Sequence, residues 1–574
     1  MTYTEILREN SVLKSQLSHV KKYSISILSN VIVAQQKEIL EHTLRKNEIN
    51  AAVDLGNYDN ILQDSADIHS DAILVFWEAA NLIEGLAYKA ENFSEAQIQD
   101  ILKKVKSELV SVFNNLGSAS LVIINTFSSL PFTTGNLRVG AFERICKELN
   151  LFVESKAPSN FILADLDKLY ARISLEKSID WRYWYSSKAL YTVDFFREYA
   201  EFVKPAFLSI MGKAKKALFL DCDNTLWKGV IGEDGMNGVI LSSNVRGGSV
   251  YEEVQSRILS LAKKGIILGL ATKNNSNDVE EIFVSHPEMI LRNEHIAIKA
   301  INWEEKPDNV RKMVKDLNIG SDSCVFLDDS DFEVGYMKEQ IPEVSVFQVP
   351  SKGYNYPGLF CEIERLFFAT NISDEDKSRI EMYQIERKRM DEKSAFESVD
   401  EYLLSLDLGM TIYVDHDDLI SRLAQMTQKT NQFNLTTKRY TDLDLRRFND
   451  SPDFTVIAFG LKDKFGDSGI TGLCILEFKN NLALIDSLLM SCRVLGRNAE
   501  KVFMDQVIKV IKDRGVNEVQ ADYFKTPKNV QVADFYSRMG FKTKSQEDLH
   551  SKYQLRSAEY NQNNINYIKI VYEK

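Results

Sequence analysis

The sequence predicts a multidomain α/β protein, and three observations lead to this expectation. The chain has 574 residues, well beyond the length at which a single hydrophobic core stops growing. Hydrophobic residues make up 44% and charged residues 26%, which is typical of folded globular proteins. Short apolar runs alternate with helical stretches along much of the chain, a pattern that favours parallel sheets.

The first alternating region predicts an α/β domain over residues 1–210. Its candidate strands lie at 23–30, 49–55, 71–77 and 120–127. Helical stretches separate these runs, as the crossover connections of a parallel sheet require.

A second alternating region predicts another α/β domain over residues 211–371. Its candidate strands lie at 216–223, 265–272, 295–302, 323–329 and 344–350. Residues 372–406 are rich in charge and contain no Gly or Pro, so we expect a helical connector there. The pattern then changes to alternating strands with a long helix near 497–514, which predicts an α+β domain over residues 407–574.

Charge and cysteine usage exclude several function classes. The net charge is −12, so general nucleic-acid binding is not expected. The N-terminus is polar and no apolar run approaches the length of a membrane span, so we expect neither export nor membrane insertion. The six scattered cysteines form no CxxC pair, which favours a reduced, cytoplasmic protein.

Phosphate chemistry is predicted in the second domain. An apolar strand leads into Asp221 and Asp223, with Thr225 close behind. Two carboxylates this close repel each other unless a cation lies between them, so Mg²⁺ is the natural partner. Asp221 would then be the nucleophile.

Later strand ends supply the remaining groups of such a site. Thr272 ends one strand and is followed by Lys273 and Asn274, so these three are candidates for binding a phosphorylated substrate. Lys306 precedes a helix and can neutralise charge on a transferring phosphoryl group. Asp328 ends another strand, next to Asp329.

The order DxDxT, Thr, Lys, DD resembles the haloacid dehalogenase (HAD) phosphatase superfamily over roughly 214–350. The resemblance implies that Asp221 is the nucleophile and Asp223 the general acid and base. Thr225 and Thr272 would bind substrate, Lys306 would stabilise charge, and Asp221, Asp223 and Asp328 would hold the metal. The alternative is a solvated turn after a strand and a surface lysine.

A loop in the last domain also resembles a known motif. Arg493, Gly496 and Arg497 lie between a strand and a helix, where backbone N–H groups favour anions. This is similar to the coenzyme A loop of Gcn5-related N-acetyltransferases (GNAT), and the stretch 529–541, with Asn529 and Tyr536, is similar to their closing signature. Asn498 departs from the usual Gly or Ala. A carrier-bound phosphopantetheine arm is therefore an alternative ligand to coenzyme A.

Three motifs together resemble the FkbH-like family: 424–440, DCDNTLWKGVIGEDG and SCRVLGRNAE. The resemblance implies that a glyceryl unit passes from 1,3-bisphosphoglycerate, through an enzyme thioester, to an acyl carrier protein. Cys222 and Cys492 are the candidate thiols, and Cys492 is preferred. Asn431 and Asn434 are candidate ligands of the pantetheine or the acid hydroxyls.

Three further expectations complete the prediction. Residues 1–210 resemble an SGNH hydrolase with Ser29, Asn30 and Gly56, but no His follows Asp180, so hydrolysis is not expected. Lys438, Arg439 and Arg447 are expected to meet an acidic carrier. The competing functions are a stand-alone phosphatase acting on a soluble phosphometabolite, with an inactive GNAT-like domain, and a GNAT-type acetyltransferase.

Overall fold

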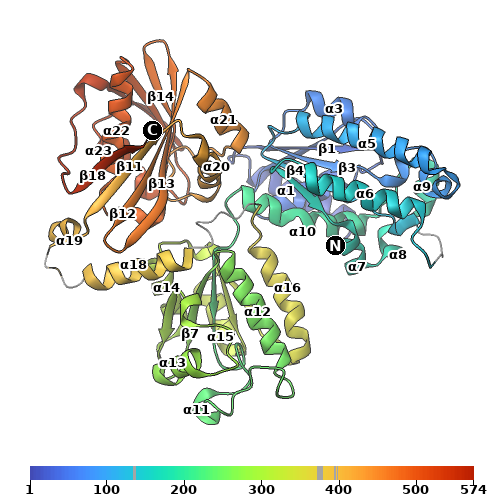
Figure 1. Ribbon diagram of the computed structural model, residues 1–574, viewed down its shortest axis with the longest axis horizontal. Coiled ribbons are helices and arrows are strands. Elements are labelled where there is room, and N and C mark those ends of the chain that lie inside the picture. The colour runs from blue at the N-terminus through green and yellow to red at the C-terminus, as the bar shows by residue number, and fades with distance from the viewer. Residues whose placement is uncertain (133–136, 371–378, 394–395, 397, 574) are drawn as a thin grey trace. The chain divides into compact units, whose positions relative to one another are not determined.

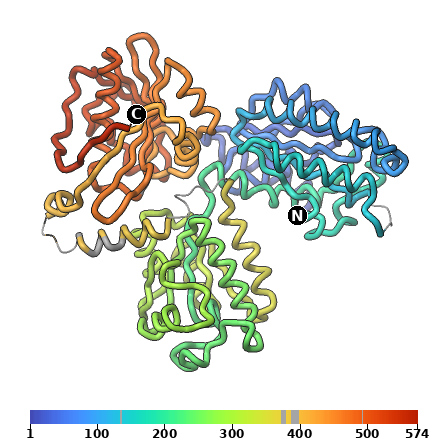
Figure 2. Tube along the Cα trace, in the orientation of Figure 1, coloured from blue at the N-terminus to red at the C-terminus, as the bar shows by residue number. Residues whose placement is uncertain are grey.

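The computed structural model describes residues 1–573 except 133–136, 371–378, 394–395 and 397, and it leaves out the side chains of 387, 388, 390, 391, 393 and 492. Part of the expected connector therefore lies outside the described residues. The chain forms two compact units, Met1–Ile210 and Met211–Lys574. Three sheets form, each from its own stretch of the chain, as the successive colours of the trace show (Figure 2).

The first unit is a parallel five-stranded sheet with helices around it. The strand order is β2-β1-β3-β4-β5, and every neighbouring pair is parallel. The strands are β1 Tyr23–Ser29, β2 Ala51–Leu55, β3 Ala72–Phe76, β4 Leu121–Asn125 and β5 Phe161–Ala164. The main helices are α1 Tyr3–Gln16, α2 Gln36–Arg45, α3 Ile61–Asp67, α5 Glu95–Asn115, α6 Ala141–Lys156, α7 Leu166–Ile173, α9 Trp181–Ser187 and α10 Val193–Ile210 (Figure 1).

The second unit begins with another parallel sheet, in the order β10-β9-β6-β7-β8. Its strands are β6 Ala217–Leu220, β7 Ile267–Thr272, β8 Ile298–Ile301, β9 Cys324–Asp328 and β10 Ser345–Gln348. Its helices are α11 Ile231–Asp234, α12 Ser249–Lys263, α13 Ser276–Ser285, α14 Lys306–Asp316, α15 Asp331–Gln340 and α16 Tyr356–Leu366, and α12 and α16 lie side by side (Figure 1). Every residue of β6, β7 and β9 is buried, as expected for strands covered on both faces.

The last sheet has eight strands and is mostly antiparallel, in the order β16-β17-β15-β14-β13-β12-β11-β18. Its strands are β11 Leu408–Val414, β12 Phe454–Asp463, β13 Gly466–Lys479, β14 Leu482–Met490, β15 Glu518–Phe524, β16 Lys542–Gln546, β17 His550–Arg556 and β18 Ile568–Glu573. The helices are α18 Arg379–Lys393, α19 Val399–Ser405, α20 Ile420–Lys429, α21 Asp442–Asp450, α22 Ala499–Asp513 and α23 Phe535–Arg538. β14 and β15 pair in parallel, with α22 as their connection, and the C-terminal β18 pairs in parallel with β11.

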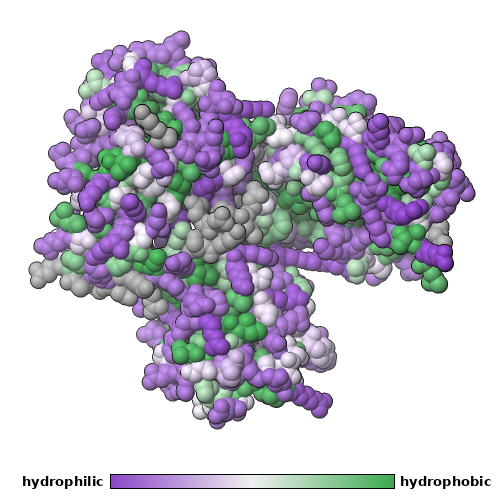
Figure 3. Space-filling model, viewed as in Figure 1, coloured by the Kyte–Doolittle hydropathy of each residue, from purple (hydrophilic) through white to green (hydrophobic). Residues whose placement is uncertain are grey.

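No helix in the described part of the chain combines the length and the hydropathy that a membrane span requires. The face shown in Figure 3 is mostly hydrophilic, and its apolar residues are scattered among polar ones. In the central strands apolar residues pack inward, and Leu218, Phe219 and Leu270 are fully buried. The edge strand β18 is different, since its Ile570, Val571 and Tyr572 are exposed.

One prediction concerns the packing of the last sheet. Gly472 of β13 lies opposite Phe459 of β12, and a Cβ at Gly472 would lie 1.9 Å from the Phe459 ring. Gly472→Ala should therefore cost about 1 to 3 kcal/mol, because an overpacked core cannot relax fully. Gly460→Ala is the matched control, since its Cβ meets nothing closer than 3.4 Å. Equal thermal unfolding temperatures for the two variants would contradict this account of the packing.

Candidate functional site

The order of the parallel strands gathers the predicted phosphate-handling residues. Asp221 directly follows β6, Thr272 ends β7, Lys306 begins α14 after β8, and Asp328 ends β9. These four strands are consecutive neighbours in the sheet, and all of them run in one direction. Their carboxyl ends therefore meet at one edge, which is where open α/β sheets bind ligands.

Lys306 lies between two buried carboxylates. Its Nζ is 2.7 Å from Asp221 Oδ1 and 2.7 Å from Asp328 Oδ2. Asp328 is fully buried, and Asp221 is 4% exposed. Burial raises the pKa of Asp221 to about 7; Lys306 opposes this rise, and Asp328 adds to it. The pKa of Lys306 is raised because its attraction to both aspartates outweighs the effect of burial, so it remains an ammonium ion.

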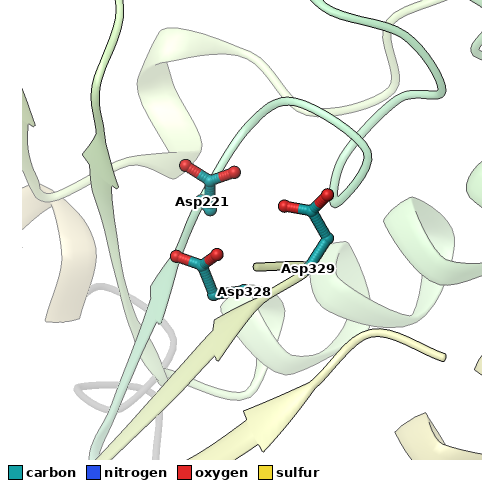
Figure 4. Close-up of side chains that lie close together, drawn as sticks. All are labelled: Asp221, Asp328 and Asp329. Carbon is teal, nitrogen blue, oxygen red and sulfur yellow. The ribbon is translucent and has the colours of Figure 1, made fainter. Parts of the chain in front are cut away.

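Three carboxylates converge beside this ammonium group. Asp221, Asp328 and Asp329 each offer an oxygen within 4.8 Å of the others, and Figure 4 shows their side chains pointing toward one another. Burial, and then Asp328, raise the pKa of Asp329. Three carboxylates against one ammonium leave an excess of negative charge, and hard oxygen ligands suit Mg²⁺. The residues present therefore fit a divalent cation.

Asp223, a predicted metal ligand, has its carboxylate outside this group of three. Its Oδ1 accepts hydrogen bonds from the Trp227 indole at 2.9 Å and the Ile231 backbone at 3.0 Å, and its Oδ2 accepts from Asn274 at 3.0 Å. Because these donors hold its carboxylate, Asp223 is not among the converging oxygens, and Asp329 is there instead. Trp227 was missed, since an apolar residue six positions after the first Asp gives no signal in the sequence.

The other predicted substrate residues surround this centre. Asn274 donates to the Thr272 hydroxyl at 3.0 Å, and Thr272 hydrogen-bonds Asp221. The Thr225 hydroxyl is fully buried and has no partner among the described residues. Lys273 pairs with Glu333 at 2.7 Å, so its charge is already balanced within the chain.

Cys222 is fully buried directly after Asp221. Burial, and then the neighbouring aspartates, raise the pKa of its thiol well above the ordinary value. It is therefore a poor nucleophile. The side chain of Cys492, the other candidate thiol, lies outside the described residues.

A short backbone segment, residues 433–435, lies between two strands of the last sheet. β14 and β15 pair only over Leu482–Ile485, and the segment 433–435 lies between the strands beyond that point. Its Leu435 donates to Leu488 of β14, and Phe524 of β15 donates to Leu435. The segment therefore fills the split between these two parallel strands.

Asn434, Asn529 and Tyr536 are buried around this segment. Asn529 Nδ2 donates to the Asn434 carbonyl at 2.9 Å, and the Asn434 side chain bonds to Thr430 and Thr437. Tyr536 lies in the hydrophobic core, where burial raises its pKa well above the ordinary value. Asn431 donates to the Gly212 carbonyl at 3.1 Å. The side chains of Asn431, Asn434 and Asn529 thus bond within the chain, whereas the buried Tyr536 hydroxyl has no partner among the described residues. Their binding of a ligand stays a prediction.

The predicted anion loop lies where expected, between β14 and α22. Gly496 and Asn498 have φ of 81° and 60°, which turn the chain into the helix. Arg497 is 4% exposed and donates to Glu386 of α18 at 2.5 Å and to Asp463 at 3.3 Å. Arg493 donates to the Ser491 hydroxyl at 3.2 Å. The loop arginines are therefore engaged within the chain.

In the first unit, the residues that resemble a hydrolase site are also engaged. The buried Ser29 hydroxyl donates to the Val31 carbonyl, and Asn30 exchanges hydrogen bonds with the backbone of Glu78. Asp180 caps α9 and pairs with Arg182 at 2.6 Å. The Ser29 hydroxyl and the Asp180 carboxylate are thus both bonded within the chain.

No family model matches the chain, and no curated protein matches it. The N-terminal part of BF1531 from Bacteroides fragilis, described as containing a phosphatase domain complexed with Mg, is 24% identical with a TM-score of 0.57. The match covers 65% of this chain and all of that one. At this identity the match shows a shared fold.

Other solved structures match a smaller part of the chain, and they include acetyltransferases. PaiA from Thermoplasma acidophilum, in complex with coenzyme A, is 18% identical over 20% of this chain and 72% of its own, with a TM-score of 0.18. The GNAT domain of S. lividans PAT is 14% identical over 25% of this chain and 89% of its own, with a TM-score of 0.21. The last sheet contains the parallel pair β14 and β15, joined by α22, inside an otherwise mostly antiparallel sheet. The SGNH and FkbH-like resemblances stay predictions.

Lys438, Arg439 and Arg447, the cations expected to meet a carrier, differ in their partners and in their exposure. Arg439 donates to the carbonyls of Thr427 and Thr430 at the end of α20, and burial lowers its pKa to about 10. Lys438 pairs with Asp486. Of the three, Arg447 alone is exposed. Arg439 therefore caps a helix, where a cation is favoured, and does not form part of an open docking face.

This capping role predicts the effect of charge reversal. Arg439→Glu should lower stability by about 2 to 3 kcal/mol, because it removes charge-assisted hydrogen bonds and puts an anion at a helix C-terminus. Arg447→Glu, on the exposed face of α21, should change stability by less than about 0.5 kcal/mol. Thermal unfolding of both variants checks this, and equal losses would refute the capping role.

Proposed function

We propose that this protein is a Mg²⁺-dependent HAD-type enzyme that removes phosphate from a small phosphorylated acid through Asp221. The arrangement of Asp221 and Asp328 around Lys306, with Asp329 beside them, supports the proposal most strongly. A buried carboxylate next to an ammonium group can attack phosphorus while the charge on the phosphoryl oxygens is neutralised.

The proposed reaction has two displacements. An Asp221 oxygen bonds to phosphorus as the bond to the leaving oxygen breaks, and Asp223 gives a proton to that oxygen. Water then attacks the aspartyl phosphate and gives a proton to Asp223, which releases inorganic phosphate and restores Asp221. The hydrogen bonds from Trp227, Ile231 and Asn274 fix the position of Asp223. A bound divalent cation, held by Asp221, Asp328 and Asp329, would neutralise charge on the phosphoryl group.

The finer proposal concerns the substrate and its acceptor. The FkbH-like motifs support a phosphorylated three-carbon acid such as 1,3-bisphosphoglycerate, whose glyceryl unit passes to the phosphopantetheine thiol of an acyl carrier protein. In that route a thiolate attacks the acyl phosphate and the C1 phosphate leaves, which forms an enzyme thioester. Hydrolysis through Asp221 removes the C3 phosphate, and the thioester exchanges with the carrier thiol. A stand-alone phosphatase acting on a soluble phosphometabolite is the second candidate. The internal engagement of Asn434, Asn529 and Arg497 favours this alternative.

Asp221→Asn should reduce phosphate release by at least about 1,000-fold, because a carboxamide is nearly isosteric but cannot form the acyl phosphate. The measurement is inorganic phosphate released from a panel of small phosphorylated acids with Mg²⁺. Asp316→Asn, an exposed Asp at the end of α14, is the matched control and should keep full activity. Turnover of Asp221→Asn within a few-fold of the parent would exclude Asp221 as the nucleophile.

Chelation tests the metal separately. EDTA should abolish phosphate release, and added Mg²⁺ should restore it, since the excess carboxylate charge at the centre repels an anionic substrate. Full activity in chelator would exclude the metal.

Carrier loading distinguishes the two candidate functions. With 1,3-bisphosphoglycerate and a phosphopantetheinylated carrier, the intact carrier should gain the mass of one glyceryl group. Cys222→Ala should leave loading unchanged, because that thiol is buried and its pKa is raised. Cys492→Ala should abolish loading if the covalent route is used. A carrier of unchanged mass, with phosphate still released, would favour the stand-alone phosphatase.

A further inference from the structure

A cluster of four charges joins helix α18 to the loop before α22. Arg497 donates to Glu386 at 2.5 Å, and Arg389 of α18 donates to Glu386 at 2.9 Å. Asp463, at the end of β12, accepts two bonds from Arg389, at 2.7 and 2.8 Å, and one from Arg497 at 3.3 Å. Two carboxylates thus balance two guanidinium groups.

The cluster is largely removed from water. The side chains of Arg389 and Arg497 are 5% exposed and that of Asp463 is fully buried, whereas Glu386 is 25% exposed. An arginine this buried needs an anionic partner, because an unpaired buried charge is strongly destabilising. Glu386, a residue of α18, supplies part of the negative charge that these arginines need, and it is the most exposed of the four side chains.

The position of Arg497 gives this contact a functional meaning. Arg497 stands one residue before the Asn498 N-cap of α22, a helix of 15 residues. A phosphate group approaching this helix end would be attracted by the helix dipole and the guanidinium together. In the structure the Glu386 carboxylate, which is also an oxyanion, already pairs with the Arg497 guanidinium.

We propose that α18 is an internal ligand of this loop and that it excludes the phosphate groups of coenzyme A or of a carrier-bound arm while Glu386 is paired with Arg497. This inference rests on the proposed use of the loop for phosphopantetheine chemistry. We consider the loop before α22 as the place where the ligand's phosphate groups bind. The split between β14 and β15 is already filled by the segment 433–435. An arriving phosphate replaces Glu386 as the anion on Arg497, and α18 separates from the loop.

Coenzyme A titration of the full chain tests the competition. Glu386→Gln keeps the side-chain shape and removes the competing charge, so it should bind coenzyme A at least tenfold more tightly than the parent. Glu381→Gln removes the same charge from an exposed position on the same helix and should bind as the parent does. Equal affinity of the parent and Glu386→Gln, or no binding by either, would overturn the proposal.

Hydrogen exchange on the unmodified chain gives a second readout that does not depend on the folding of a variant. At saturating coenzyme A, amides of 379–393 should exchange faster, while those of the buried strand β13 stay unchanged. Bound coenzyme A with unchanged exchange in α18 would refute displacement of the helix. Phosphate release should be the same in the parent and Glu386→Gln. Failure of the phosphatase proposal therefore appears in the phosphate assay, and failure of this inference appears in the titration.

Discussion

The contact of Lys306 with Asp221 and Asp328 is the interaction on which the rest of the candidate centre depends. Two carboxylates buried side by side repel each other, and each loses hydration. One ammonium at 2.7 Å from both makes their close approach tolerable. Lys306 reaches them because it begins α14, after the strand β8 that lies two positions from β6 in the sheet.

The same charges make the centre suited to phosphoryl transfer. Lys306 alone does not balance the charge of Asp221, Asp328 and Asp329, which leaves negative charge for a divalent cation to neutralise. Burial raises the pKa of Asp221. Asp223, only two residues from Asp221, has a different environment because three N–H groups hold its carboxylate. Two aspartates close in sequence thereby have different surroundings, one beside an ammonium group and the other held by N–H donors.

The GNAT-like part uses charge differently. At the centre around Lys306 the excess negative charge remains available to a cation. In the loop before α22, Glu386 and Asp463 neutralise Arg497 within the chain. The backbone segment 433–435 likewise satisfies the edges of β14 and β15. The fold of this part therefore does not by itself decide which ligand the loop binds, because the loop's Arg497 already pairs with Glu386 and Asp463.

The sequence by itself determined the strands of the two parallel sheets, except the short edge strand β5, and the order of the predicted phosphate-handling residues. Those features are local: apolar runs such as 216–220 and 323–327 form buried strands, and polar residues that follow them lie at strand ends. It also placed the loop at Arg493 and Arg497 and the helix after it. Only the tertiary structure decided which partners these side chains have. Asp329 joined the carboxylate group in place of Asp223, Asn434 and Asn529 turned to the backbone, and Glu386 met Arg497 across 111 residues of chain. Such partners are set by long-range packing, which neither spacing nor composition encodes.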